Sequence, residues 1–271
     1  MTKGTSYGVF INSLLVPYFI MHNNWRGIWV TVGVGTLVLS IAAIFIFVRL
    51  NILHDNDTVA DSSDPNQACQ QSSHLGIGKK TIPPWIITFL NGLTTMPFQN
   101  YLSPYLREEL GCSLEIASQV WKIIGIIGMV AGFIVGWLSD QIGIRYSLIL
   151  TYFLVLLAAI LVVFGSTHST LIVAGACFAL AFYPIFGLVP AYIAKTAEGF
   201  ASTKIFGVAN ITLGVGGMLG NFLGGWSKTL TGTFMWIYVA IGLLAVLLSF
   251  LVFSLPIEGA KSVGISTQDH A

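Results

Sequence analysis

Long apolar runs without charged residues alternate with short polar stretches along the chain. The runs free of Asp, Glu, Lys and Arg are residues 4–25, 27–48, 81–106, 123–139, 146–194, 205–227 and 229–257. A helix rises about 1.5 Å per residue and the hydrocarbon core of a bilayer is roughly 30 Å thick, so about 20 apolar residues suffice to span it.

The run at 146–194 is long enough for two spans, which the polar turn at 165–170 separates. The pattern therefore predicts about eight membrane-spanning helices, at residues 5–21, 28–50, 83–106, 114–138, 146–165, 170–195, 204–227 and 232–254. These segments are too long and too uniformly apolar for barrel strands. An all-α, polytopic integral membrane protein is expected.

Composition agrees with a membrane location. Of the 271 residues, 55% are hydrophobic and only 8% are charged, against roughly 25% charged residues in soluble domains. The high hydrophobicity excludes a disordered chain, the net charge of +1 does not fit a nucleic-acid binder, and the 3 scattered Cys indicate neither a disulfide framework nor a metal site.

The first predicted span is short and contains Asn12 and Pro17. A signal peptide would have a basic start and a site of small residues for cleavage. Only Lys3 precedes this span, and bulky or polar residues follow it. We expect a retained helix.

Basic residues assign the two faces of the membrane. Eight spans place both termini on one side, which then carries Lys3, Arg49, Lys79, Lys80, Arg145, Lys195, Lys204 and Lys261, while the other side carries Arg26, Arg107 and Lys228. Because cytoplasmic loops are rich in Lys and Arg, we expect cytoplasmic termini in a multi-pass protein of the cell membrane.

One polar stretch divides the chain unequally. Residues 51–82 are rich in Asp, Asn, Ser and Gln and too poor in apolar residues to fold alone. We expect two helices in residues 1–50, a flexible cytoplasmic linker at 51–82, a six-helix bundle at 83–256 and a cytoplasmic tail at 257–271.

The most specific motif is GWLSDQIGIR at residues 136–145, between the fourth and fifth spans. Gly136 would let a neighbouring backbone approach, and Gly143 would permit a sharp turn. Asp140 could accept from a facing helix N-terminus or pair with Arg145. The alternative is a charged turn that only orients the two helices.

This motif resembles the cytoplasmic-loop signature of the major facilitator superfamily, G-x-L-[AS]-D-R-x-G-[RK]-[RK]. Gln141 and Ile144 depart from it. Trp25-Arg26 after the first span, the position of the linker, and a G-x3-G-N-x2-G-G element at 216–225 add to the resemblance, although Asn221 replaces the Pro of the family's antiporter motif.

By this resemblance, the chain looks like helices five to twelve of a twelve-helix transporter, without the first four. A fragment, a misplaced start and a truncated gene all remain open. The resemblance implies a cytoplasmic gate latched by Asp140 and Arg145. It also implies secondary active transport of a small organic solute by alternating access, with a proton as one candidate coupling ion. A non-transporting remnant or a scaffold partner is the alternative.

Polar residues within spans are the candidates for the substrate cavity, since polar groups that face lipid are costly. Asn91, Thr95 and Gln99 recur every four residues and share one helical face. Interhelical hydrogen bonding explains them equally well. Tyr183, beside Pro184, and Asn210 are further candidates, although packing is the commoner role of such a Tyr.

Lys122 is the charged residue deepest in a predicted span. It would suit an organic anion as the solute. Snorkelling to the outer surface, or pairing with Glu115 or Glu109, is the alternative.

Two ladders of glycine indicate close helix packing. They comprise Gly128, Gly132 and Gly136 in the fourth span, and Gly216, Gly220, Gly224 and Gly225 in the seventh. The sequence contains no catalytic motif, and no Asp, Glu or His is predicted near the middle of the membrane. We therefore expect neither an enzyme nor a bound cofactor or metal, and the expected partners are the lipid bilayer, a solute and a coupling ion.

Overall fold

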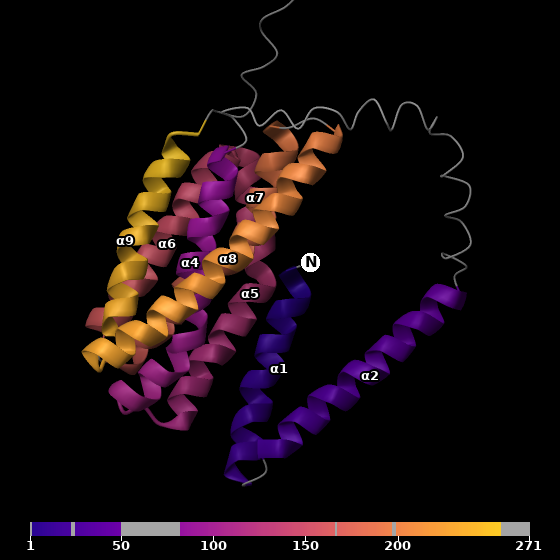
Figure 1. Ribbon diagram of the computed structural model, residues 1–271. Coiled ribbons are helices and arrows are strands. Elements are labelled where there is room, and N and C mark those ends of the chain that lie inside the picture. The colour runs from indigo at the N-terminus through magenta and orange to yellow at the C-terminus, as the bar shows by residue number, and fades with distance from the viewer. Residues whose placement is uncertain (1, 23–24, 50–81, 166, 197–198, 256–271) are drawn as a thin grey trace, which may run out of the picture. The chain divides into compact units, whose positions relative to one another are not determined.

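The computed structural model describes residues 2–22, 25–49, 82–165, 167–196 and 199–255, and these residues form helices without strands. The helices are α1 (Thr2–Met21), α2 (Trp25–Arg49), α4 (Ile82–Pro104), the π-helix η3 (Tyr105–Glu109), α5 (Leu114–Ile142), α6 (Ile144–Phe164), α7 (His168–Thr196), α8 (Gly199–Thr231) and α9 (Met235–Phe253) (Figure 1). Each of the eight predicted spans coincides with an α-helix. The predicted linker at 51–82, except Ile82, and the tail at 257–271 lie outside the described residues.

Two units divide the chain. One comprises residues 1–13 and 77–271, and so holds α4 to α9 together with the start of α1. The other comprises residues 14–76, and its helix α2 is largely apolar between Arg26 and Arg49 and has no buried residue. The candidate site lies within the first unit.

Six described helices are long and apolar enough to cross a membrane, namely α2, α5, α6, α7, α8 and α9. The predicted first and third spans fold as α1 and α4, which are not among the helices that satisfy this criterion of length and hydropathy. The stretch Thr5–Met21 of α1 is apolar but shorter than these six helices, and α4 carries several polar residues. The polar side chains of α4 point inward, since Asn91 is 2% exposed and Thr95 is 0% exposed. The expected all-α membrane bundle is confirmed.

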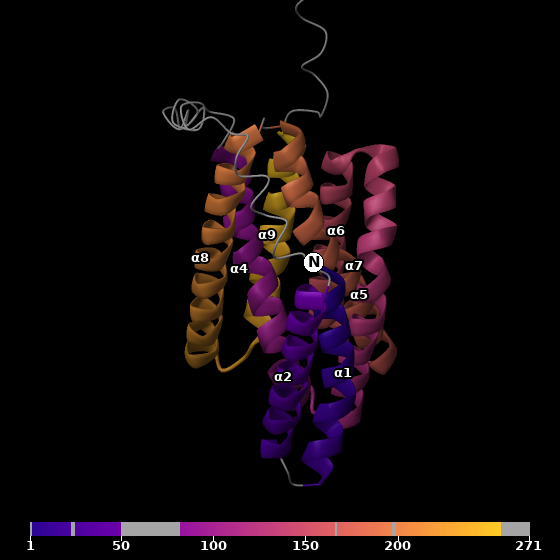
Figure 2. The ribbon, with the colours of Figure 1, turned by 90° about the vertical axis from the view of Figure 1, so that its right-hand side faces the viewer.

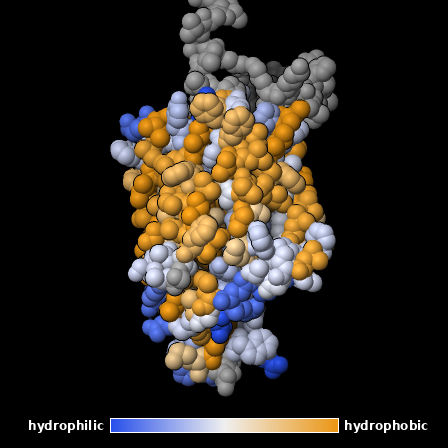
Figure 3. Space-filling model, turned by 90° about the vertical axis from the view of Figure 1, so that its left-hand side faces the viewer, coloured by the Kyte–Doolittle hydropathy of each residue, from blue (hydrophilic) through white to orange (hydrophobic). Residues whose placement is uncertain are grey.

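The outer surface of the bundle is apolar, as a membrane protein requires. Figure 3 shows hydrophobic residues over most of the face that it displays. Large apolar side chains on α9 and α5 are exposed, among them Phe250, Leu243 and Phe133. Lipid tails can cover these side chains without the cost that water would impose.

Helices α4 and α8 run side by side and in the same direction (Figure 2). The Trp85 indole donates to the Ile205 carbonyl at 3.2 Å, and the hydroxyls of Thr88 and Thr212 lie 2.8 Å apart. Further along the pair, the Asn100 amide donates to the Asn221 side chain at 3.0 Å. Hydrogen bonds at several levels therefore fix the register of the two helices.

An aromatic cluster joins α4, α7 and α9 in the core. The rings of Phe98 and Phe178 stack with centroids 4.1 Å apart, and Tyr238 meets Phe98 edge-on at 5.2 Å. Such pairs contribute roughly 0.5–1.5 kcal/mol each beyond their burial. This cluster anchors one wall of the unit in which the candidate site lies.

Candidate functional site

A cavity of about 50 Å³ opens between α4, α7 and α8. Its polar lining residues are Thr88 and Asn91 on α4 and Asn210 on α8. The rest of the wall is apolar and consists of Ile185, Phe186, Val189, Pro190, Phe206, Ala209 and Leu213. The cavity thus has the character of a small-molecule site, in which a few polar groups are set in apolar walls.

The sequence-predicted residues Asn91 and Asn210 meet in this cavity. Asn91 is 2% exposed, and its side-chain oxygen has no hydrogen-bond partner among the described residues. Asn210 is exposed, and its amide donates to the Phe206 carbonyl at 2.9 Å. Thr88, which the sequence reasoning missed, has its hydroxyl engaged with its own helix and with Thr212.

The other predicted residues of α4 lie outside the cavity wall. Thr95 is buried and donates to the Asn91 carbonyl at 2.7 Å within its own helix. Gln99 is half-buried, one turn further along the helix. Of the three residues that share this face of α4, only Asn91 therefore lines the cavity.

Tyr183 and Lys122 are also separate from this cavity. The Tyr183 ring is buried, lies against Gly128 of α5 and meets Phe182 edge-on at 5.2 Å. Lys122 is half-buried on α5. Glu109, which the sequence offered as a partner for Lys122, pairs with Lys228 instead.

The loop that joins α5 to α6 turns at a single residue. Gly143 has φ 91° and ψ 154°, a conformation that is essentially restricted to glycine. Arg145 follows and donates to the carbonyl of Phe253 at the end of α9, and its guanidinium carbon lies 4.8 Å from the centroid of the Phe253 ring. Asp140 is exposed in the last turn of α5. Among the described residues, the structure thus links this loop to α9 through Arg145.

The two glycine ladders differ in their surroundings. A Cβ atom at Gly220 would lie 2.7 Å from the Pro97 ring and 2.8 Å from the Leu93 carbonyl, closer than atoms can approach. The α8 ladder packs against α4, where Gly216 meets Phe89 and both Gly224 and Gly225 meet Tyr101.

In the α5 ladder, a Cβ atom at Gly128 would lie 2.2 Å from the Tyr183 ring, and the close backbone neighbour on this helix belongs to Gly125, outside the ladder, where a Cβ atom would lie 2.7 Å from the Phe10 backbone. Gly132 is half-buried, and open space surrounds Gly136, so the close backbone approach expected at Gly136 is not seen.

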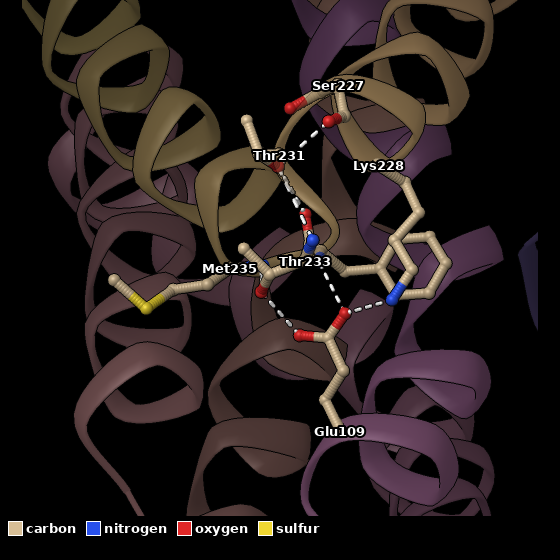
Figure 4. Close-up of polar contacts among 7 residues, drawn as sticks. Glu109, Ser227, Lys228, Thr231, Thr233 and Met235 are labelled. Atoms are coloured by element: carbon tan, nitrogen blue, oxygen red, sulfur yellow. Dashed lines mark hydrogen bonds and ion pairs between the residues drawn. The ribbon is translucent and has the colours of Figure 1, made fainter.

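A polar junction at the opposite end of the bundle from Gly143 joins η3 to the connection between α8 and α9. Glu109 accepts hydrogen bonds from the Lys228 amine, the Thr233 hydroxyl and the Phe234 backbone N–H, each at 2.6 Å (Figure 4). Lys228 also lies 4.3 Å from the centroid of the Phe234 ring. Because Phe234 is the N-cap of α9, the carboxylate also faces the positive end of that helix.

The surroundings of Glu109 change its pKa. Burial alone would raise the pKa, but the hydrogen bonds from Lys228, Thr233 and the Phe234 N–H, together with the charge of Lys228, lower it below the ordinary 4.5. The carboxylate is therefore ionised at neutral pH.

Comparison with known families decides the wider relationship. The family model of the Major Facilitator Superfamily matches residues 2–220. The chain belongs to the major facilitator superfamily. The expectation drawn from the loop motif is confirmed.

Relatives of this superfamily chain include transporters of different solutes. One relative is solute carrier family 2, facilitated glucose transporter member 2, of Mus musculus, which is 32% identical to this chain over 112 residues. The aligned region covers 39% of this chain and 21% of that protein. The fold of this chain resembles the crystal structure of a mutant POT peptide transporter in complex with sulfate, with a TM-score of 0.59, 17% identity, and coverage of 71% of this chain and 41% of that chain. The chain therefore spans less than half of the length of either.

The contact between Glu109 and Lys228 was not predicted from the sequence. Glu109 and Lys228 are far apart in sequence, and an acidic residue just beyond a span resembles any solvated helix end. The available signal was Lys228 itself, a cation at the end of an apolar helix that needs a partner if water is excluded.

Proposed function

We propose that the chain is part of a secondary active transporter that moves a small organic solute by alternating access. Membership of a family of membrane transporters supports this function. The observation that carries it is the cavity between α4, α7 and α8, where Thr88, Asn91 and Asn210 are polar residues in an otherwise apolar wall. A polar group in such a place is costly and indicates a functional role.

The dimensions of the cavity fit one part of a solute site. About 50 Å³ accommodates a few solute atoms or water molecules, since one water needs roughly 10–15 Å³ on this measure. Family transporters bind solute between two six-helix halves near the midplane of the membrane. In this proposal α4 to α9 form one such half, and a second half would complete the site.

The proposed orientation places the Gly143 turn on the cytoplasmic face and the Glu109 junction on the outer face. The distribution of Lys and Arg between the loops supports it. In this orientation, Asp140 and Arg145 border the cytoplasmic gate, and the contact of Arg145 with the end of α9 would couple the gate to that helix.

An organic anion as the solute rests on Lys122 alone. The described wall of the cavity contains no charged side chain, and Lys122 lies elsewhere on α5. An anion would therefore need a contact outside this cavity.

Uptake into proteoliposomes tests the function. The chain would be reconstituted and given labelled glucose, alanyl-alanine and lactate separately, as representatives of a sugar, a peptide and an organic anion. The proposal predicts saturable uptake of at least one solute above protein-free vesicles. Replacing Ala209 by Trp would fill the cavity and should abolish this uptake, while Ala240→Trp on α9, outside the described wall of the cavity, is the control. The chain would also be tested after co-reconstitution with helices that complete the bundle. If neither preparation takes up a solute, transport is refuted and the scaffold alternative is favoured.

A further inference from the structure

Contacts between α4 and α8 continue from one end of the pair to the other. The Trp85 indole donates to the Ile205 carbonyl near the start of both helices, and Lys228 of α8 pairs with Glu109 of η3, beyond the far end of α4. Positions 85 and 109 are separated by roughly 35 Å of helix, which is comparable with the roughly 30 Å hydrocarbon core. The pair is therefore fastened at both ends of a predicted span.

Between these two ends the backbones of α4 and α8 touch. Gly216 of α8 lies against α4, where an added Cβ atom would overlap the Phe89 carbonyl. Gly92 of α4 lies against α8, where an added Cβ atom would overlap the Leu213 carbonyl and lie 2.8 Å from the Gly217 nitrogen. Small residues on both helices therefore bring the two backbones into direct contact.

Pro97 is the position at which α4 would bend most readily. Proline has no N–H, so it cannot donate to the carbonyl four residues earlier, which is that of Leu93, and sharp helix kinks occur at such prolines. Gly220 of α8 lies beside this position, because a Cβ atom there would lie 2.7 Å from the Pro97 ring and 2.8 Å from the Leu93 carbonyl. Helix α8 thus braces α4 at its proline.

Hydrogen bonds hold α4 to α8 on both sides of this proline. About one turn beyond it, the Tyr101 hydroxyl donates to the Asn221 carbonyl at 2.6 Å, and the Asn100 amide donates to the Asn221 side chain at 3.0 Å. Before it, the hydroxyls of Thr88 and Thr212 lie 2.8 Å apart. A bend of α4 alone would break the contacts on one of the two sides.

We propose that α4, η3 and α8 move as one rigid unit, in which α8 prevents α4 from bending at Pro97. The Glu109 junction is the far fastening of this unit. The cavity then changes width only on its α7 side, because its α4 and α8 walls move together. The role of the unit in opening the cavity rests on the proposed transport function, whereas its rigidity does not.

Distances between spin labels test the rigidity without any need for transport. In the whole chain, with its three Cys replaced by Ser, labels at the exposed positions Ile86→Cys and Thr203→Cys report one end of the α4–α8 pair. Labels at the exposed positions Glu108→Cys and Thr229→Cys report the other end. Electron paramagnetic resonance should give one distance for each pair, the same in detergent and in bilayers and with or without glucose, alanyl-alanine or lactate. A second distance for either pair would overturn the proposal.

Two substitutions test the individual fastenings with the same labels. Glu109→Ala should broaden the distance distribution between positions 108 and 229 alone, because the other contacts along the pair remain. Gly220→Val should broaden the distributions at both ends, because it separates the helices at Pro97. Gly214→Val is the matched control, since no atom lies within 4 Å of a Cβ atom built there. Unchanged distributions in Glu109→Ala and Gly220→Val would overturn the proposal.

A permanent link between the two helices tests the role of the unit in transport. The side chains of Asn100 and Asn221 lie 3.0 Å apart, so Asn100→Cys and Asn221→Cys should join in a disulfide under oxidation or through a short bis-methanethiosulfonate reagent. If the helices move as one unit, the linked chain should take up solute into proteoliposomes at the same rate as the reduced chain. Failure to form the link by either route would overturn the close pairing.

The outcomes separate this inference from the proposed function. A fall in uptake on linking that a reductant reverses would overturn the rigid unit and leave transport standing. No uptake by the unlinked chain, alone or in the completed bundle, would refute transport, and the spin-label distances would then decide on the rigid unit by themselves.

Discussion

Replacing Glu109 by Ala removes the acceptor of three hydrogen bonds that join η3 to the α8–α9 connection. The variant leaves the Lys228 amine, the Thr233 hydroxyl and the Phe234 N–H without this partner. Glu109 is 16% exposed and Lys228 is 28% exposed, so water can solvate only part of what is lost. The junction should therefore loosen without unfolding the bundle.

The magnitude follows from these contacts. Three hydrogen bonds to a charged group would contribute about 4–5 kcal/mol at roughly 1.5 kcal/mol each. Partial exposure and the solvation of Lys228 reduce this to about 2–3 kcal/mol. Glu109→Gln keeps the size and one acceptor oxygen, so it should cost only about 1 kcal/mol.

Thermal unfolding in detergent, followed by Trp fluorescence, provides the assay. Glu109→Ala should lower the midpoint by about 5–10 °C, because 1 kcal/mol corresponds to roughly 2–4 °C in a chain of this size class. Glu108→Ala is the matched control, since Glu108 is the neighbouring carboxylate and is exposed. Its midpoint should stay within about 2 °C of the wild type.

The pH dependence gives a second readout with a defined sign. The folded-state pKa of Glu109 lies below its ordinary 4.5, so its stabilisation is fully present above pH 4.5. The stabilisation is lost as the pH falls through the folded-state pKa, and the gap between the wild type and Glu109→Gln should then close. Equal midpoints for Glu109→Ala and Glu108→Ala at neutral pH would refute a stabilising junction.

Four further substitutions test the turn, the helix pair and the proposed roles in transport. Gly143→Ala should cost about 1–3 kcal/mol in unfolding measurements, because φ is 91° there. Gly220→Val should separate α4 from α8 and broaden the size-exclusion peak in detergent, since even a Cβ atom would lie 2.7 Å from the Pro97 ring. Asp140→Asn should lower the initial uptake rate without changing membrane insertion, and an unchanged rate would refute the latch role. Lys122→Ala should weaken uptake of lactate selectively if Lys122 binds anions; equal effects on glucose and lactate, or none, would leave only a snorkelling role.

Open glycine positions serve as controls for the first two of these. No atom lies within 4 Å of a Cβ built on Gly136 or Gly214. Gly136→Ala and Gly214→Val should therefore leave stability and the elution profile close to the wild type. Destabilisation by Gly136→Ala as large as that by Gly143→Ala would contradict the backbone argument.

The helices were predictable because charge and length alone limit what can cross a membrane. The segment 114–138, for example, folds as part of α5, which runs on to Ile142 before the Gly143 turn. The special backbone of Gly143 was also predictable, since a short connection between two spans needs a sharp turn. What ordinary periodicity does not reveal is the π-helix η3 after Pro104, because its hydrogen-bonding pattern depends on the surrounding contacts.

The site was only partly predictable. The i, i+4 spacing identified the face of α4, but only Asn91 on that face reaches the cavity, because the wall that faces it comes from α7 and α8. Asn210 was a weaker candidate in the sequence, since nothing local links it to Asn91. The sequence could not decide whether Tyr183 contacts substrate or only packs against a neighbouring helix. The structure shows its ring against Gly128 of α5.

Labelling of a single cysteine at position 210 tests alternating access most directly, because Asn210 is exposed and lines the cavity. Cys69, Cys112 and Cys177 would first be replaced by Ser, and a membrane-impermeant maleimide would be applied to vesicles of each orientation. The account predicts labelling of Asn210→Cys from both faces of the membrane, with protection by the transported solute. Labelling from one face only, unchanged by solute, would contradict it.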